Sequence, residues 1–129
     1  MSTVGIIANP AAGKDIRRLI SQSRFISNQE KINIVRRVLV GLGSMGVDKV
    51  ILMPDQSNLA RAAIEDLPTE IDFSFLDMPI FNAEIDTTRA ASMMEESGVS
   101  AIVSLGGDGT NRAITKGTNQ IPLMPISTG

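Results

Sequence analysis

Residues 106–111 carry the groups best suited to chemistry: three glycines, a carboxylate, a hydroxyl and an amide. They follow a short, β-branched and almost continuously apolar run over residues 99–105, which is typical of a buried parallel strand. The glycines let a ligand approach the bare main chain, and a helix N-terminus after them would present N–H groups and a positive dipole end to an anion. This pattern predicts a phosphate-binding turn. Its candidate binding residues are Gly106, Gly107, Gly109, Thr110 and Asn111.

Asp108 separates a functional interpretation of this turn from a purely geometric one. A tight strand-to-helix turn that needs glycine for its backbone shape alone has no use for an acid at this position. A carboxylate among phosphate-binding amides repels the anion that they attract, unless it contacts a metal ion or a substrate hydroxyl. Asp108 is therefore the predicted catalytic residue, and Thr110 or Asn111 is expected to cap the short helix that ends at Gly117.

The composition excludes several kinds of chemistry and of partner. Twelve basic and fourteen acidic residues give a net charge of -2, so no basic excess points to nucleic acid or to an anionic membrane. Without histidine or cysteine, the chain holds no Ser-His-Asp triad, thiol nucleophile, disulfide or Cys–His zinc site. No apolar run approaches the roughly 18 residues of a membrane span. Because the first residues also lack the basic-then-apolar order of a signal peptide, we expect a cytoplasmic protein.

Apolar strands and amphipathic helices alternate along the chain. This alternation predicts an α/β fold with a doubly wound, mostly parallel five-stranded sheet and helices on both faces. The predicted strands are 3–8, 49–53, 71–78, 99–105 and 121–126, and the predicted helices begin near 16, 28, 58, 84 and 113. Prolines in the last strand indicate an edge or irregular pairing. The loops with Asn9, Gly106 and Thr128 all follow strands, so they should share the carboxyl edge of the sheet, where such folds bind ligands.

Two other glycine motifs resemble nucleotide-binding signatures, but their context argues against that function. Gly13 and Lys14 follow a strand as in a P-loop, yet Ala8 and Asp15 stand where that motif needs Gly and Ser or Thr. Residues 41–46 match G-x-G-x-x-G, yet they follow a helix and precede a strand, the reverse of a dinucleotide fingerprint. Left-handed glycines that end the helix explain this second motif better. The charged residues of that helix expected to face away from the core are Lys31, Arg36 and Arg37.

The sequence Gly-Gly-Asp-Gly-Thr at residues 106–110 resembles the signature of the NAD kinase and diacylglycerol kinase superfamily. Residues 125–129 are similar to another loop of that superfamily. Residues 9–19 with 86–91 are closest to its branch called ATP-NAD kinase-like or acetoin-catabolism protein X-like. The resemblance covers the whole chain but only the N-terminal domain of the superfamily, whose members continue into a β-rich domain. It implies that residues 1–129 are one nucleotide-binding α/β domain, truncated before the second domain and inactive alone.

By the same resemblance, the protein is expected to be an ATP-dependent phosphotransferase that phosphorylates a ribose hydroxyl and so converts NAD to NADP. ATP and Mg²⁺ would be its cofactors and NAD its substrate, and Asp108 would orient the hydroxyl or accept its proton. The residues expected to contact the nucleotide are Asn9, Pro10, Gly106, Gly107, Gly109, Thr110, Asn111 and Thr128. A lipid or sphingoid-base kinase, a nucleotide-binding regulator without turnover, and a homo-oligomer all stay open. Asp86, Thr88 and Arg89 resemble a branch-specific segment, although a helix start explains Asp86 and Thr88 equally well.

Overall fold

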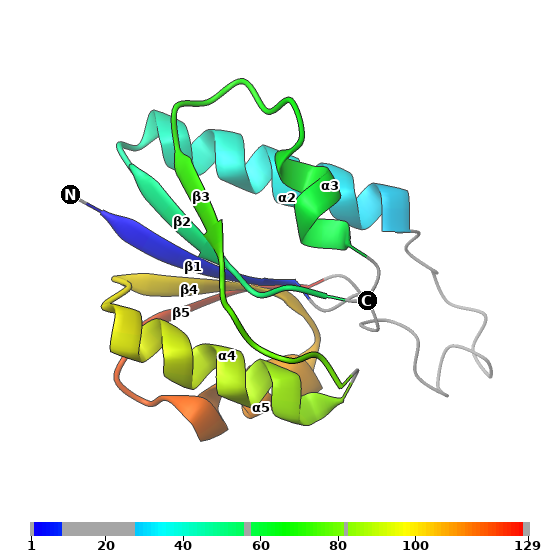
Figure 1. Cartoon of the computed structure of the whole chain (residues 1–129), viewed down its shortest axis with the longest axis vertical. Helices are drawn as coiled ribbons and strands as arrows, with labels where there is room; N and C mark the ends of the chain where they lie inside the picture. Colours follow the sequence, from blue (N-terminus) through cyan, green and yellow to red (C-terminus); the bar gives the residue numbers. More distant parts are fainter. Residues whose placement is uncertain (1, 9–27, 56–57, 82, 128–129) are drawn as a thin grey trace.

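The fold is a sheet of parallel strands between two layers of helices (Figure 1). The computed structural model describes residues 2–8, 28–55, 58–81 and 83–127. In chain order the elements are β1 (Thr3–Ala8), α2 (Asn28–Ser44), β2 (Lys49–Leu52), α3 (Leu59–Ile64), β3 (Asp72–Phe75), α4 (Glu84–Ser97), β4 (Ala101–Gly106), α5 (Asp108–Gly117) and β5 (Leu123–Ser127). The predicted α/β class is confirmed, and every strand pair is parallel. In these ranges, no helix has the length and apolar character that crossing a bilayer requires.

The boundaries of several elements differ from the expectation, and those of β3 and α5 differ most. β3 is shorter than predicted, because it is an edge strand whose pairing partner β2 has only 4 residues. α5 begins at Asp108 rather than near residue 113, so Thr110 and Asn111 lie inside its first turn. The prediction that either of them caps this helix is therefore wrong, and the N-cap residue is Gly107. The helix predicted to begin near residue 16 lies outside the described residues.

β1 lies at the centre of the sheet, whose strand order is β3-β2-β1-β4-β5. The chain builds outward from β1 to β2 and β3 and then crosses back to β4, so the direction of building reverses between β1 and β4. Ligands of such sheets bind outside the carboxyl ends of the strands at this reversal. The two carboxyl ends are neighbours here, because Ala8 of β1 pairs in register with Leu105 of β4. β5 is an edge strand, as its prolines predicted.

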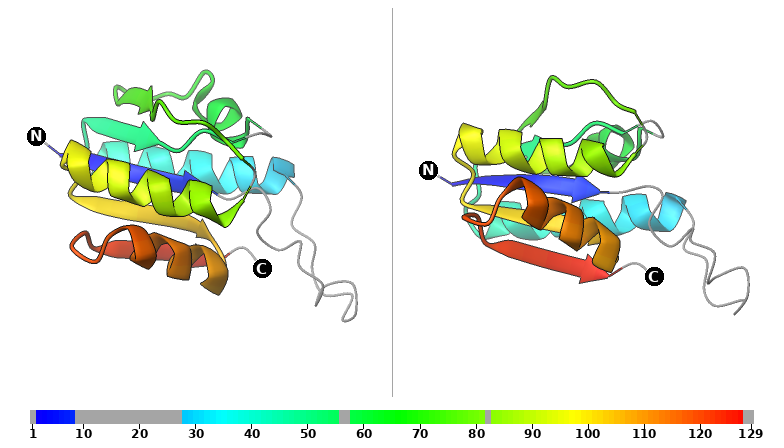
Figure 2. Two further views of the ribbon diagram at one scale, coloured as in Figure 1. Left: turned by 60° about the horizontal axis from the view of Figure 1, so that its bottom comes forward. Right: turned by 90° about the horizontal axis from the view of Figure 1, so that it is seen from below.

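Two hydrophobic cores hold the helices against opposite faces of the sheet (Figure 2). α2 and α3 cover one face, and α4 and α5 lie side by side on the other. Successive residues of β4 contribute to different cores: Ile102 belongs to the core under α4 and α5, whereas Val103 and Leu105 belong to the core under α2 and α3. Because side chains alternate along a strand, Ser104 shares the face of Ile102 and points its hydroxyl toward the α4–α5 side.

The prediction that the glycines of residues 41–46 end α2 in left-handed conformations holds for one of the three. α2 continues through Gly41 and Gly43, and only Gly46 then takes the left-handed conformation, with a φ of 94°. A Cβ on Gly43 would lie 2.7 Å from Thr69 Oγ1, so close packing accounts for this glycine. The motif connects the end of α2 to the start of β2, which places it at the amino edge of the sheet, away from the edge where ligands bind.

The prediction that three charged residues of α2 face away from the core is wrong for Lys31, and Arg36 is half-buried beside α3. Lys31 is buried, with 1% of its surface exposed. Arg36 donates hydrogen bonds to the backbone carbonyls of Ala63 and Glu65, at 3.1 and 2.7 Å. Arg37 is exposed as expected. The helical period alone could not reveal that α3 packs beside α2, or that carbonyls at the end of α3 accept hydrogen bonds from Arg36.

Candidate functional site

Several helices begin at the carboxyl edge of the sheet, and a buried carboxylate caps the first turn of one of them, α3. α3, α4 and α5 follow β2, β3 and β4 in turn. At the start of α3, the buried carboxylate of Asp55 accepts hydrogen bonds from the N–H groups of Leu59 and Ala60, at 2.8 and 3.1 Å. Because this carboxylate satisfies N–H groups that have no acceptor within the helix, the start of α3 is closed to other anions.

Asp86, in the first turn of α4, instead holds the chain that leads into this helix. Its buried carboxylate accepts hydrogen bonds from the N–H of Phe81, at 3.0 and 3.2 Å, and from the N–H of Ala83, at 3.2 Å. Thr88 donates to a backbone carbonyl of α5 at 2.8 Å, and the guanidinium of Arg89 lies 5.6 Å from the ring centre of Phe81. The hydrogen bonds give Asp86 and Thr88 a structural role, whereas the buried Nη1 of Arg89 has no hydrogen-bond partner among the described residues.

α5 begins at a glycine N-cap, which has no side chain to cap the helix. Its N-cap residue Gly107 has a φ of -111° and a ψ of -163°, and the N–H of Asn111 donates to the Gly107 carbonyl at 3.1 Å. The N–H groups of a first helical turn lack acceptors within the helix, and the helix dipole makes this end positive. The start of α5 therefore presents these donors to an anion, in contrast to the start of α3, where the Asp55 carboxylate accepts hydrogen bonds from two such groups.

The three glycines of this turn have different physical explanations. A Cβ on Gly106 would lie 2.5 Å from Oγ1 and 2.8 Å from Cβ of Thr110, so packing against Thr110 requires a glycine there. A Cβ on Gly107 or Gly109 would meet no atom of the described residues within 4 Å. Neither of these two glycines has a positive φ. Among the described residues, neither packing nor backbone shape accounts for these two glycines, and the close approach of a ligand to their backbone stays a prediction.

Asp108 is the exposed first residue of α5 and lies between those two glycines. An acid in the first turn of a helix interacts favourably with the dipole, so the position of Asp108 is stable without a ligand. In the described part of the chain, no three His, Cys, Asp or Glu side chains gather to hold a metal ion. A single carboxylate nevertheless fits the way proteins hold Mg²⁺ beside a nucleotide, with one or two carboxylates, water and the substrate phosphates as ligands.

The sequence interpretation missed Ser104, which is fully buried on β4. Its hydroxyl donates a hydrogen bond to Oδ1 of the half-buried Asn111 at 2.7 Å, across the turn from the strand to the helix. This bond connects the end of β4 to the first turn of α5. The signal in the sequence is a lone hydroxyl in a strand that is otherwise apolar from Ala101 to Leu105.

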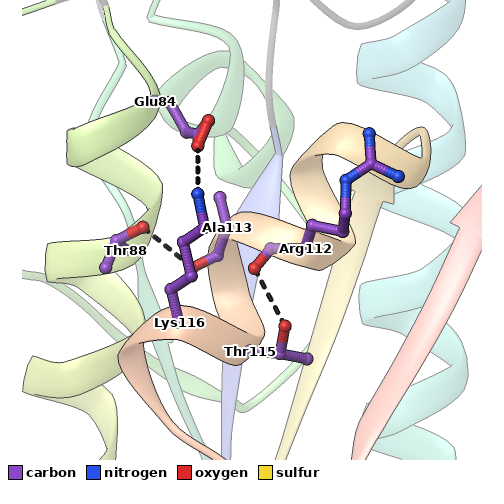
Figure 3. Close-up of polar contacts among 6 residues, drawn as sticks. All are labelled: Glu84, Thr88, Arg112, Ala113, Thr115 and Lys116. Atoms are coloured by element: carbon purple, nitrogen blue, oxygen red, sulfur yellow. Dashed lines mark hydrogen bonds and ion pairs between the residues drawn. The ribbon is translucent and has the colours of Figure 1, made fainter.

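Side chains of α4 hold α5 in place along its length (Figure 3). The ammonium of Lys116 pairs with the Glu84 carboxylate at 3.2 Å, and Thr88 donates to a carbonyl in the middle of α5 at 2.8 Å. Near the end of α5, Ser92 donates to the carbonyl of Gly117 at 2.8 Å. Because α4 is itself packed on the sheet, these bonds anchor the middle and the C-terminal end of α5.

One turn holds most of the predicted site. The residues found in it are Gly106, Gly107, Asp108, Gly109, Thr110 and Asn111. Asn9 and Pro10 follow β1 and Thr128 follows β5, and all three lie outside the described residues. β1 and β5 are the two neighbours of β4 in the sheet, and the three strands end at the same edge. The contribution of these three residues to the site stays a prediction.

Comparison with known proteins connects the chain to a family. The family model described as ATP-NAD kinase N-terminal domain matches residues 4–129. Acetoin catabolism protein X of Cupriavidus necator is 42% identical to the chain over 136 residues, which cover 98% of this chain and 37% of that protein. The chain thus spans a little over a third of the length of this relative. No solved structure matches the chain.

Proposed function

The chain belongs to the ATP-NAD kinase N-terminal domain family, and from this premise we propose that the intact protein is an ATP-dependent phosphotransferase that converts NAD to NADP. The observation that carries the proposal is the start of α5. Among the described residues, this helix N-terminus has no side-chain cap, and no packing contact or positive φ requires its glycines Gly107 and Gly109. Phosphate is the ligand class that such a backbone favours.

The proposed mechanism assigns a separate role to backbone and side chain in the turn. Phosphoryl transfer depends on alignment and charge neutralisation more than on covalent chemistry. The N–H groups around Gly107 and Gly109, with the positive end of α5, hold the phosphates of the nucleotide. Asp108 orients the attacking ribose hydroxyl and accepts its proton. A magnesium ion bound together with ATP supplies further neutralisation of the phosphate charge.

Residues on both sides of the turn complete the proposed nucleotide site. Thr110 and Asn111 contribute a hydroxyl and an amide from α5, and Asn9 with Pro10 and Thr128 contribute from the loops after β1 and β5. Both strands adjoin β4, so these loops start beside the turn. Because the chain spans 37% of its relative's length, the proposed NAD site also uses residues from the rest of the intact protein.

The test is to replace Asp108 with asparagine in the intact protein and to measure NADP formed from ATP and NAD. Asparagine keeps the shape of the side chain but loses its charge and its basicity, so kcat should fall by about 10²- to 10⁴-fold. The affinity for free ATP should stay the same or rise, because the carboxylate repels phosphate. Asp48→Asn is the matched control, since it removes the same charge from an exposed residue just before β2, at the amino edge of the sheet.

The outcomes distinguish the proposed kinase from its alternatives. Unchanged turnover of Asp108→Asn would remove Asp108 from the mechanism. If the unaltered protein bound nucleotide but formed no product at any enzyme concentration, it would be a nucleotide-binding regulator. Turnover with a sphingoid base or diacylglycerol in place of NAD would keep the phosphotransferase and overturn the assigned acceptor.

A further inference from the structure

One buried polar contact connects the strand before the turn to the helix after it. Ser104 is 0% exposed, and its hydroxyl donates to Asn111 Oδ1 at 2.7 Å. Ser104 lies on the face of β4 that carries α5, in register with Ile7 of β1 and with Pro125 of β5. A buried hydroxyl needs an acceptor, because an unsatisfied polar group in a protein interior is costly. The oxygen of Asn111 meets this need.

This contact determines which end of the Asn111 amide remains for another partner. An asparagine side chain has a carbonyl oxygen that accepts hydrogen bonds and an NH₂ group that donates two. Because the oxygen accepts the hydrogen bond of the Ser104 hydroxyl, the NH₂ group is the end left for a ligand. No described residue accepts a hydrogen bond from Nδ2 of Asn111. The amide therefore keeps its two donors in the same helical turn as the open backbone of Gly107 and Gly109.

We propose that Ser104 is a positioning residue for nucleotide binding, which holds the Asn111 amide with its N–H donors toward the phosphate oxygens of the ligand. The inference rests on the proposed function, because it names a nucleotide as the ligand. Phosphate oxygens only accept hydrogen bonds, so they match an NH₂ group, whereas the amide oxygen in its place would repel them. The alternative is a purely structural bond between β4 and α5, of the kind that Ser92 makes to Gly117.

The experiment is a double-mutant cycle on the intact protein, with the affinity for Mg²⁺–ATP measured by calorimetric titration. Asn111→Ala should weaken ATP binding by about 10-fold, and Ser104→Ala by about 3- to 10-fold. Because Ser104 acts through Asn111, Ser104→Ala should change the affinity by less than about 2-fold in the Asn111→Ala background. Adenosine, which has no phosphate, should bind equally to all of these variants.

Two further variants separate positioning from structural support. Ser92→Ala is the matched control, since it also removes a hydroxyl that donates to α5, and it should leave the ATP affinity unchanged. Asn111→Asp keeps an acceptor for the Ser104 hydroxyl but removes both donors and adds a negative charge. This variant should lose at least as much affinity as Asn111→Ala.

Several results would overturn the inference while nucleotide binding itself persists. One is that Ser104→Ala lowers the ATP affinity as much in the Asn111→Ala background as in the unaltered protein. Another is that Ser92→Ala lowers the ATP affinity as much as Ser104→Ala does. A third is that Ser104→Ala or Asn111→Asp leaves the ATP affinity unchanged. An equal loss of adenosine affinity would also contradict a contact with phosphate. If the unaltered protein bound no ATP, the proposed function would fail, and this would be visible before any variant is measured.

Discussion

Replacing Gly109 with alanine should raise stability and lower nucleotide affinity at the same time. Gly109 is the second residue of α5, its φ is not positive, and a Cβ there would meet no atom of the described residues within 4 Å. The fold therefore has room for a methyl group at this position. A phosphate held by the N–H groups of the first helical turn would occupy the same space, so a methyl group would displace it.

The expected magnitudes follow from the helix and from the lost hydrogen bond. Alanine is favoured over glycine in a helix by about 0.5–1 kcal/mol. In a domain of this size, that difference should raise Tm by roughly 2–5 °C. A hydrogen bond to a charged group contributes about 1.5–3 kcal/mol. The loss of one such bond to phosphate should therefore weaken ATP binding by about 10- to 100-fold.

Both quantities can be measured on the same samples of the intact protein, by thermal unfolding without nucleotide and by calorimetric titration with Mg²⁺–ATP. Gly41→Ala is the matched control, because Gly41 also lies within a helix and a Cβ there also meets no described atom within 4 Å. It should reproduce the gain in Tm with unchanged affinity. If Gly109→Ala were stabilised but still bound ATP as tightly as the unaltered protein, phosphate would not bind at this turn. A lower Tm would contradict the inference that the fold does not need this glycine.

Two further substitutions test the assignments of other glycines and acids. Gly43→Ala should destabilise the protein by about 1–3 kcal/mol in denaturant unfolding, because the new Cβ would lie 2.7 Å from Thr69 Oγ1. Its ATP affinity should not change, and a selective loss of binding in the folded variant would restore the dinucleotide interpretation of this motif. Asp55→Ala should cost about 1–2 kcal/mol, since it removes the acceptor of two N–H groups at the start of α3. An unchanged free energy of unfolding would show that water replaces this cap.

The elements and the candidate turn could be predicted from the sequence because both depend on neighbouring residues. The local period of apolar residues distinguishes strands from helices, and alternation of the two requires the crossovers that make a sheet parallel. The turn at residues 106–111 stands out for the same reason, since its glycines and its acid directly follow a buried strand. Residues 41–46 could also be placed at the end of a helix and before a strand, the reverse of the order in a dinucleotide fingerprint.

The tertiary structure alone decided which groups contact one another, and so which parts of the pattern have a structural explanation. Residue 106 must be glycine because the side chain of Thr110, in the first turn of α5, packs where a Cβ would lie. Ser104 and Asn111 meet because α5 packs over the end of β4, and Lys31 is buried although the helical period placed it in solvent. Periodicity records only the conformation within one element. The orientation of a helix over a sheet depends instead on how both cores pack. The packing contacts join residues that lie far apart in the sequence, so no local pattern records them.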